Sequence, residues 1–355
     1  MDNRPHIFGI DRTDLRDLFG QWDWPGYRAD QLMEWVYHQH VLDPQQMTNL
    51  SQPDRQRLSR ELRFTSGRIA AHQIASDDVQ KLLIDWSNSE SSSADRNESP
   101  PQTESVLIPT SDRRTACISS QIGCPVRCTF CASGLGGLDG NLAAGQIVEQ
   151  VWHLTQLLPA ERITHVVFMG MGEPLANFDS VVAATGILMA DWGLNISGRR
   201  ITISTVGVPA QIRRLADLGL PVTLAISLHA PNDELRRRLI PWANYVAIDQ
   251  LIDAGRYYFD KTGREITLEY ILLRHINDRE SHARELTQVA RRLRSNVNLI
   301  RYNEVKGLPY QRPASDDVHR FQAILATAGI NCHIRASRGR DIAAACGQLR
   351  REKKG

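Results

Sequence analysis

The chain has 355 residues, of which 42 are Lys or Arg and 40 are Asp or Glu, so its formal charge is +2. This length allows one large domain and a smaller one with an ample core, which excludes a small scaffold held together by disulfides. The near balance of charges does not by itself indicate nucleic-acid binding. No segment approaches the length of a membrane span, and the amino terminus has no apolar run of the signal-peptide type, so we expect a cytoplasmic protein without a membrane partner.

Residues 1–86 are predicted to form a small helical domain. In RADQLMEWVYHQH, residues 28–40, the apolar residues recur on one face of a helix, and VQKLLIDW, residues 79–86, predicts a strand. Arginines also gather in this region, namely Arg55, Arg57, Arg60, Arg63 and Arg68. A solvated surface explains such a run as well as a contact with RNA phosphates does.

Residues 87–103 include SNSESSSADRNESPPQ, which has almost no apolar residue and predicts a mobile loop. Residues 104–350 are predicted to be one domain, followed by a basic tail at 351–355. In this domain buried strands alternate with amphipathic helices, and the strand segments are THVVFMG, RRITISTV, PVTLAISLH, EITLEYILL, SNVNLIRYN and NCHIRAS. Such alternation predicts a parallel sheet.

Six parallel strands are consistent with a doubly wound sheet or with an incomplete barrel. In both folds, ligands bind at the carboxyl ends of the strands. The segments that end the predicted strands are MGMGEP, STVG, SLHAP and RYNEV. We therefore expect the functional site among these four segments.

Four of the six cysteines lie within residues 117–131. Cys124, Cys128 and Cys131 have the spacing C-x3-C-x2-C, which supplies three thiolates from one loop. Three ligands indicate an iron–sulfur cluster with one iron open, because a structural zinc site needs four protein ligands. The alternative is a zinc loop completed by Cys117 or His165.

The motif CPVRCTFC is similar to the signature of the radical S-adenosylmethionine (SAM) superfamily. The segments GMGEPLANFDSVV, RRITISTVG, LAISLHAPNDELRRRLIP, ITLEYILLRHIND and DIAAACGQL resemble, in this order, the RlmN/Cfr family of RNA adenine methyltransferases. The resemblance covers essentially residues 15–350. It implies an α/β fold, an incomplete (βα)6 radical SAM barrel behind a small helical accessory domain that binds RNA.

The resemblance also implies the cofactors and partners. A 4Fe–4S cluster on the three loop cysteines binds SAM, and the enzyme methylates an adenine ring carbon, carbon-2, of 23S ribosomal RNA and also of transfer RNA. An electron donor of the reductase or flavodoxin type is required. Radical chemistry suits this reaction because carbon-2 of adenine is not nucleophilic.

The resemblance assigns three catalytic residues. Cys346, in AAACGQL, is methylated by one SAM molecule, loses hydrogen to a radical derived from a second, and bonds to the adenine. Cys117 resolves this adduct and forms a transient disulfide with Cys346. Glu104, in TESVLIP, is the proton acceptor. Cys332 matches neither cysteine role, and we expect it in the core.

The resemblance carries the SAM contacts over by position, to Gly172, Glu173, Ser204, Ser227, Leu228, His229 and Asn303. Glycine at 172 allows close backbone approach, and a carboxylate at 173 can accept from the methionine amino group of SAM. Two alternatives stay open. One is methylation of adenine carbon-8 by the same machinery, and the other is a non-catalytic RNA-binding protein that carries zinc or a cluster.

Overall fold

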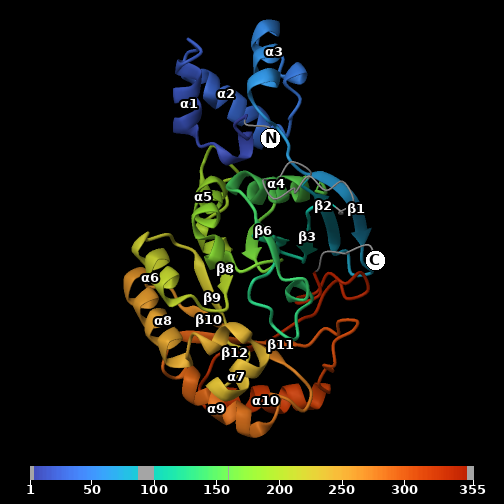
Figure 1. The fold of residues 1–355 in the computed structure, drawn as a ribbon, viewed down its shortest axis with the longest axis vertical. Helices are drawn as coiled ribbons and strands as arrows, with labels where there is room; N and C mark the ends of the chain where they lie inside the picture. Colours follow the sequence, from blue (N-terminus) through green and yellow to red (C-terminus); the bar gives the residue numbers. More distant parts are fainter. Residues whose placement is uncertain (1–3, 87–99, 159, 350–355) are drawn as a thin grey trace.

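The computed structural model describes residues 4–86, 100–158 and 160–349 of the chain, and Figure 1 shows a helical module above a larger α/β body. The module contains α1 (Arg12–Gly20), α2 (Tyr27–Met33) and α3 (Gln52–Glu61). Side chains cap two of these helices, since Asp11 accepts from the first-turn amides of α1 and Ser51 accepts from Asp54 in α3. The predicted helix over 28–40 is α2 continued by one π-helical turn at Glu34–His38.

The body is built on one long sheet with the strand order β1-β2-β3-β4-β7-β8-β9-β10-β11-β12. The strands are β1 (Arg68–Ile74), β2 (Gln80–Asp85), β3 (Gln102–Pro109), β4 (Arg114–Cys117), β7 (His165–Phe168), β8 (Ile201–Thr205), β9 (Thr223–Ser227), β10 (Ile266–Leu272), β11 (Ser295–Arg301) and β12 (Cys332–Arg335). The pairs from β4 through β12 are parallel, and β1 to β4 pair antiparallel. All six predicted parallel strands are present, and the short strand β4 joins them.

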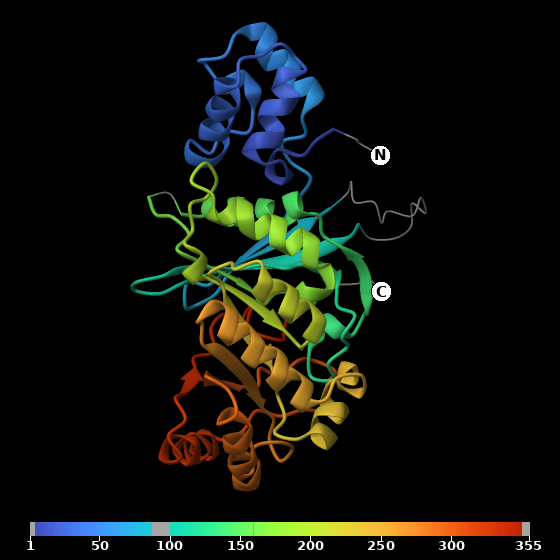
Figure 2. The same cartoon turned by 90° about the vertical axis from the view of Figure 1, so that its left-hand side faces the viewer.

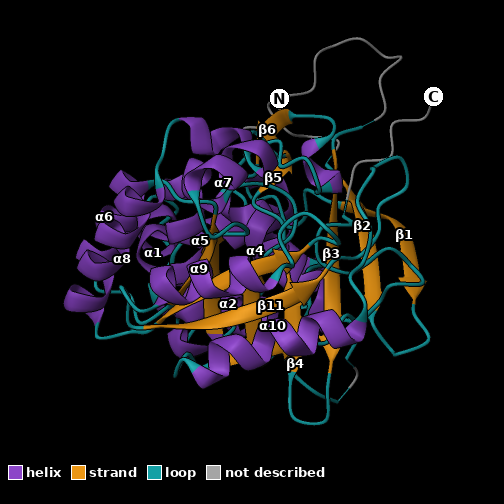
Figure 3. Ribbon diagram, turned by 90° about the horizontal axis from the view of Figure 1, so that it is seen from below, coloured by secondary structure: helices purple, strands orange, loops and turns teal. Residues whose placement is uncertain are grey.

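Helices follow most of the parallel strands and cover the sheet. They are α4 (Ala144–Thr155), α5 (Phe178–Met189), α6 (Pro209–Asp217), α7 (Asp233–Leu239), α8 (Ile248–Thr262), α9 (Glu280–Ala290) and α10 (Ser315–Thr327). Figures 2 and 3 show these helices packed outside the parallel strands, and Figure 3 shows β1 and β2 at the edge of the sheet that lies farthest from β12 in the strand order. This is the open, incomplete barrel that the family resemblance implied. Across the described residues, no helix combines the length and apolar character needed to cross a bilayer.

The structure divides the first hundred residues differently from the boundaries predicted at 86 and 103. Strands β1 and β2 belong to the main sheet, because β2 pairs along its whole length with β3. The helical module therefore ends before Arg68. Strand β3 begins at Gln102, inside the predicted loop, whereas residues 87–99 and the basic tail lie outside the described residues.

The module rests on α4 through a buried carboxylate. Glu149 accepts hydrogen bonds from the backbone amides of Ser66 and Gly67 at 3.0 and 2.9 Å and from the Ser66 hydroxyl at 2.6 Å. His6 Nε2 and His153 Nε2 each lie 3.4 Å from the same carboxylate. Because Glu149 has no exposed side-chain surface, these contacts tie the start of β1 and the amino-terminal segment to the body.

Candidate active site

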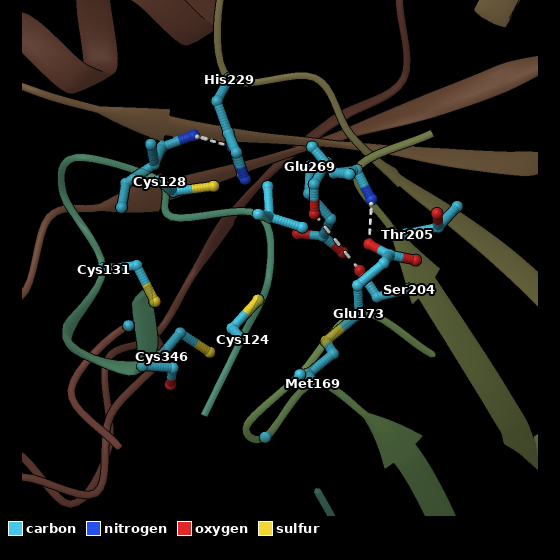
Figure 4. A pocket seen from close by; sticks show the side chains of 18 of the residues that line it. Cys124, Cys128, Cys131, Met169, Glu173, Ser204, Thr205, His229, Glu269 and Cys346 are labelled. Carbon is cyan, nitrogen blue, oxygen red and sulfur yellow. Dashed lines mark hydrogen bonds between the residues drawn. The ribbon is translucent and has the colours of Figure 1, made fainter. Parts of the chain in front are cut away.

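A cavity with about 840 Å³ of empty space opens where the parallel strands end, and Figure 4 shows it from close by. The structure brings together here most of the residues singled out from the sequence, namely Cys124, Cys128, Cys131, Gly172, Glu173, Ser204, Ser227, His229 and Cys346. They come from the carboxyl ends of β8 and β9, from the loops after β7 and β9, and from the two loops that carry Cys124 and Cys346. The cavity therefore lies at the edge of the sheet where the strand-end segments place it.

The three loop cysteines lie in the connection between two short antiparallel strands, β5 (Gln121–Gly123) and β6 (Leu138–Asn141). The Cys124 amide donates to Gly137 O at 2.8 Å, and the Cys131 amide donates to Cys128 O at 3.1 Å, so the loop turns back on itself. Arg127, between the first two cysteines, has a φ of 56°, in the left-handed region. This tight turn allows one short loop to present three sulfurs to one cavity.

The donor set fits a 4Fe–4S cluster. The three cysteines are free and partly buried, and burial raises the pKa of Cys124 to about 12 and raises those of Cys128 and Cys131. Buried thiols become thiolates when a metal binds them. Among the described side chains, no three His, Cys, Asp or Glu groups lie close enough together to bind one metal ion. A cluster does not require this, because each of the three cysteine sulfurs binds a different iron.

The zinc alternative has no geometric support in the described part of the chain. His165 begins β7, at the end of the strand opposite the cavity, where the Thr164 hydroxyl lies 2.9 Å from its Nδ1. Cys117 does not lie in the loop of the three cysteines, and it lines a neighbouring cavity.

The structure of the GMGEP turn requires a glycine at position 172 and holds the glutamate at position 173 in place. Gly172 has a φ of 105°, and a Cβ there would lie 2.7 Å from atoms of Ser120 and Gln121, so only glycine fits. Glu173 is 3% exposed, and its two carboxylate oxygens accept from the amides of Leu175 at 3.0 Å and Val206 at 2.8 Å. Burial raises the pKa of Glu173. The backbone thus fixes the carboxylate at the cavity wall and leaves lone pairs for a ligand.

His229 is held as a neutral ring in the SLHAP segment. Its Nδ1 accepts from the Ile271 amide at 3.1 Å, and burial, with the nearby charge of Arg236, lowers its pKa to about 3. The ring stands edge-on to Phe130 of the cluster loop, with centroids 5.2 Å apart. Because Nδ1 is an acceptor, the remaining ring proton is on Nε2, which can donate to a ligand.

Ser204 and Ser227 end two adjacent strands, with their hydroxyl oxygens 3.3 Å apart. Two of the residues expected to contact SAM lie elsewhere. The Leu228 side chain is 1% exposed and packs in the main core, and Leu228 is not among the residues that line the main cavity. Asn303 lines the neighbouring cavity and donates to Cys346 O at 3.2 Å.

Cys346 and Cys117 line this neighbouring cavity together, with about 530 Å³ of empty space. Cys346 also lines the main cavity, so it lies between the two. Its loop is docked on the cluster loop, because the Ala132 amide donates to Gly347 O at 2.8 Å and the Ser133 hydroxyl donates to Leu349 O at 2.6 Å. The structure therefore brings together two cysteines from opposite ends of the catalytic domain.

Glu104 lies on β3, beside the strand that carries Cys117. It is 6% exposed and forms an ion pair with Lys81, with Oε1 2.7 Å from the ammonium nitrogen. It is not among the residues that line either cavity. Cys332 is partly buried on β12 and packs against the main core, as expected.

Two ionisable residues of the main cavity were missed from the sequence. Glu269, on β10, is 3% exposed, and its Oε2 has no hydrogen-bond partner in the described structure. Arg335, at the end of β12, lines both cavities. The sequence contained a signal for Glu269, because this glutamate stands inside the apolar strand ITLEYILL. A polar residue in a fully buried strand needs a partner.

Comparisons with known proteins agree with this architecture. A family model described as Radical SAM superfamily matches residues 118–286, and one described as Ribosomal RNA large subunit methyltransferase N-terminal domain matches residues 6–63. The probable dual-specificity RNA methyltransferase RlmN of Rhodopirellula baltica is 42% identical over 98% of this chain and 91% of its own. The dual-specificity RNA methyltransferase RlmN of Halorhodospira halophila is 44% identical over 97% of this chain and 92% of its own.

The solved structure of a radical SAM methyltransferase from Sphaerobacter thermophilus matches with a TM-score of 0.93 at 38% identity, over 98% of this chain and 100% of that one. The fold and the cysteine loop thus define a radical SAM enzyme. The chain belongs to the RlmN/Cfr family of radical SAM RNA methyltransferases, which work with a 4Fe–4S cluster and SAM on an RNA substrate.

Proposed function

We propose that this enzyme methylates carbon-2 of an adenine in 23S ribosomal RNA and in transfer RNA. The relatives are named dual-specificity RNA methyltransferases, and the amino-terminal family model is named for the large-subunit ribosomal RNA. The observation that carries the proposal is the shared cavity of Cys117 and Cys346 beside the cluster loop. A protein that only binds RNA needs neither thiol there.

In this proposal Cys124, Cys128 and Cys131 hold the cluster, and residues of the main cavity hold SAM. The bound cofactors supply a methyl group and a 5′-deoxyadenosyl radical. Glu173 accepts from the amino group of SAM, Gly172 lets the backbone approach it, and His229 donates from Nε2. Ser204 and Ser227 complete the wall, and Asn303 fixes the Cys346 loop.

Cys346 accepts the methyl carbon on sulfur and carries it to carbon-2 of the adenine. Glu104 accepts the proton that leaves the ring. The Cys117 sulfur then attacks the Cys346 sulfur, and the bond between the Cys346 sulfur and the transferred carbon breaks. The electron pair of that bond stays with the carbon, which takes up a proton to complete the methyl group, and a disulfide between Cys117 and Cys346 remains. Burial raises the pKa of Cys117 to about 12, so this thiol is protonated at neutral pH and must release its proton for the attack.

The helical module is proposed as the RNA-binding part, and a reductase or flavodoxin-type protein as the electron donor. The structure reduces the number of arginines in the module whose guanidinium groups are available to contact RNA phosphates. Arg55 donates to three carbonyls within the module, and Arg57 lies 4.7 Å over the Trp22 ring. Arg60, 71% exposed on α3, forms a surface ion pair with Glu61 at 2.9 Å, and its guanidinium has further N–H donors that can contact a phosphate.

The proposal predicts which modified nucleoside the enzyme makes. Ribosomal and transfer RNA from cells with and without the gene are digested and compared by nucleoside mass spectrometry. Adenosine methylated at carbon-2 should be present in both RNAs only with the gene. Adenosine methylated at carbon-8 in its place would identify the other ring carbon as the target.

Replacement of each of the two reactive cysteines should stop the reaction at a different step. Cys346→Ala should give neither a methylated protein nor an RNA adduct. Cys117→Ala should form the adduct and not release it, so nuclease-treated protein should carry a nucleotide on the peptide that contains Cys346. Peptide mass spectrometry reads both outcomes. RNA methylation by Cys346→Ala, or normal turnover by Cys117→Ala, would contradict the two-cysteine mechanism.

A further inference from the structure

The loop that carries Cys346 contains only turns between Ala336 and Leu349. A loop without regular backbone pairing is positioned by contacts from other elements. One side of it is docked on the cluster loop, as described above. The other side lies against the hairpin of β1 and β2, which the sequence had grouped with the RNA-binding module.

The turn of this hairpin and the Cys346 loop exchange hydrogen bonds in both directions. The Ser76 amide donates to Asp341 Oδ2 at 2.8 Å. The Gly339 amide donates to Asp77 Oδ1 and Oδ2 at 3.2 and 3.1 Å. Two carboxylates, one on each partner, thus clamp the two segments at a point seven residues or fewer from Cys346.

Apolar packing closes the same contact. Gly339 has a φ of 64°, and a Cβ on it would lie 2.7 Å from Val79 Cγ1, so the loop backbone lies directly on the hairpin. Val79 packs in one buried cluster with Ala344 and Leu349 of the loop and with Cys117 of β4. The hairpin therefore packs against both segments that carry the reactive cysteines.

Lys81 connects this contact to Glu104. Its side chain is 9% exposed on β2, and its ammonium nitrogen lies 2.7 Å from Glu104 Oε1. The same nitrogen donates to Ala343 O, 3.4 Å away and three residues before Cys346. A buried lysine is rare unless it is paired, and an ammonium has three donors that can hold several groups at once.

We propose that Lys81 is a positioning residue that holds Glu104 and the Cys346 loop in one arrangement, with the β1–β2 turn as a clasp on that loop. The inference rests on the roles given to Cys346 and Glu104 in the proposed function. It assigns residues 68–85 to catalysis and not to the binding of RNA. It also explains why this hairpin belongs to the main sheet.

The test compares Lys81→Met with the matched control Lys261→Met, an exposed lysine on α8 that is 52% exposed. Methionine keeps the straight apolar stem and removes the donors. In Lys81→Met, kcat for RNA methylation should fall roughly 100-fold, because a displacement of about 1 Å has such an effect. The KM for RNA and the formation of 5′-deoxyadenosine without RNA should change less than about twofold. Lys261→Met should match the wild type.

A second variant, Asp77→Ala, loosens the clasp at a partly exposed site and leaves Glu104 and Lys81 in place. Hydrogen exchange of residues 336–349 should rise about tenfold in both variants and stay unchanged in the control. Hydrogen exchange does not depend on catalysis. It therefore tests whether the β1–β2 turn holds the Cys346 loop, even if Cys346→Ala shows that the two-cysteine mechanism is wrong. Unchanged exchange, full activity of Lys81→Met, or a loss of RNA affinity in place of kcat would overturn the proposal.

Discussion

Arg236 has no exposed surface, although it begins a run of three arginines. Its guanidinium donates to Leu228 O at 3.2 Å and Val206 O at 2.5 Å, so it ties together the loops after β8 and β9. Burial lowers its pKa to about 10. Arg237 and Arg238 are exposed. Within one turn of helix α7, a buried arginine with a structural role is thus followed by two arginines on the surface.

The cluster loop gives a prediction at this scale. Cys128→Ala removes one of three thiolates from a loop that holds no substitute among its described residues, so the purified protein should lose most of its iron and its SAM cleavage. Cys332→Ala is the matched control, because Cys332 lies on β12 outside both cavities. Iron analysis and the visible absorbance of anaerobic protein check both variants. Full iron content in Cys128→Ala would show that this thiol is not a ligand.

His6 should make stability depend on pH. Burial outweighs the attraction of Glu149 and lowers its pKa to about 4, whereas in the unfolded chain it is about 6.5. Between these values the unfolded state binds a proton that the folded state does not, so stability is lost as pH falls. The free energy of unfolding should drop by about 2 kcal/mol more between pH 7.5 and pH 5 in the wild type than in His6→Gln. Urea unfolding measures this, and equal slopes would contradict it.

At the scale of elements, the joint between the helical module and α4 depends on a close approach of two backbones. A Cβ on Gly145 would lie 2.2 Å from His6 Nδ1 and 3.0 Å from Gly9 N. The Trp152 indole of α4 also donates to Val36 O at 3.1 Å. Helix α4 is therefore the platform on which the module sits.

Gly145→Ala should weaken this joint even though alanine favours helix, and should cost about 1 to 3 kcal/mol of stability through overpacking. Gly186→Ala in α5 is the matched control, since nothing lies within 4 Å of a Cβ there. That change should stabilise the protein by up to about 1 kcal/mol. Thermal or urea unfolding compares the two variants, and equal effects would remove the argument for a steric joint.

At the scale of the whole molecule, the helical module contributes no residue to the lining of either cavity, and an adenine must leave its stack to reach the main cavity. Arg60→Ala on α3 should lower RNA affinity and reduce the slope of log K against log salt by about 0.7 to 0.9. Arg320→Ala on α10, 61% exposed at the far end of the body, should leave both unchanged. Filter binding over a salt series makes the comparison, and equal slopes would place the RNA elsewhere.

The sequence by itself determined the parallel strands, the strand ends that line the cavity and the loop with three cysteines. Each of these depends on spacing within a few residues, which a linear pattern records directly. Leu228 and Asn303 show the limit of such patterns, because their positions in the motifs do not tell which way their side chains point.

Only the tertiary structure decided that Cys117 and Cys346 share a cavity, that the β1–β2 hairpin joins the main sheet, and that Lys81 lies between Glu104 and the Cys346 loop. These contacts join residues far apart in the chain. They depend on how β2, β3 and β4 pair and on where an irregular loop docks, and neither leaves a periodic signal in the sequence.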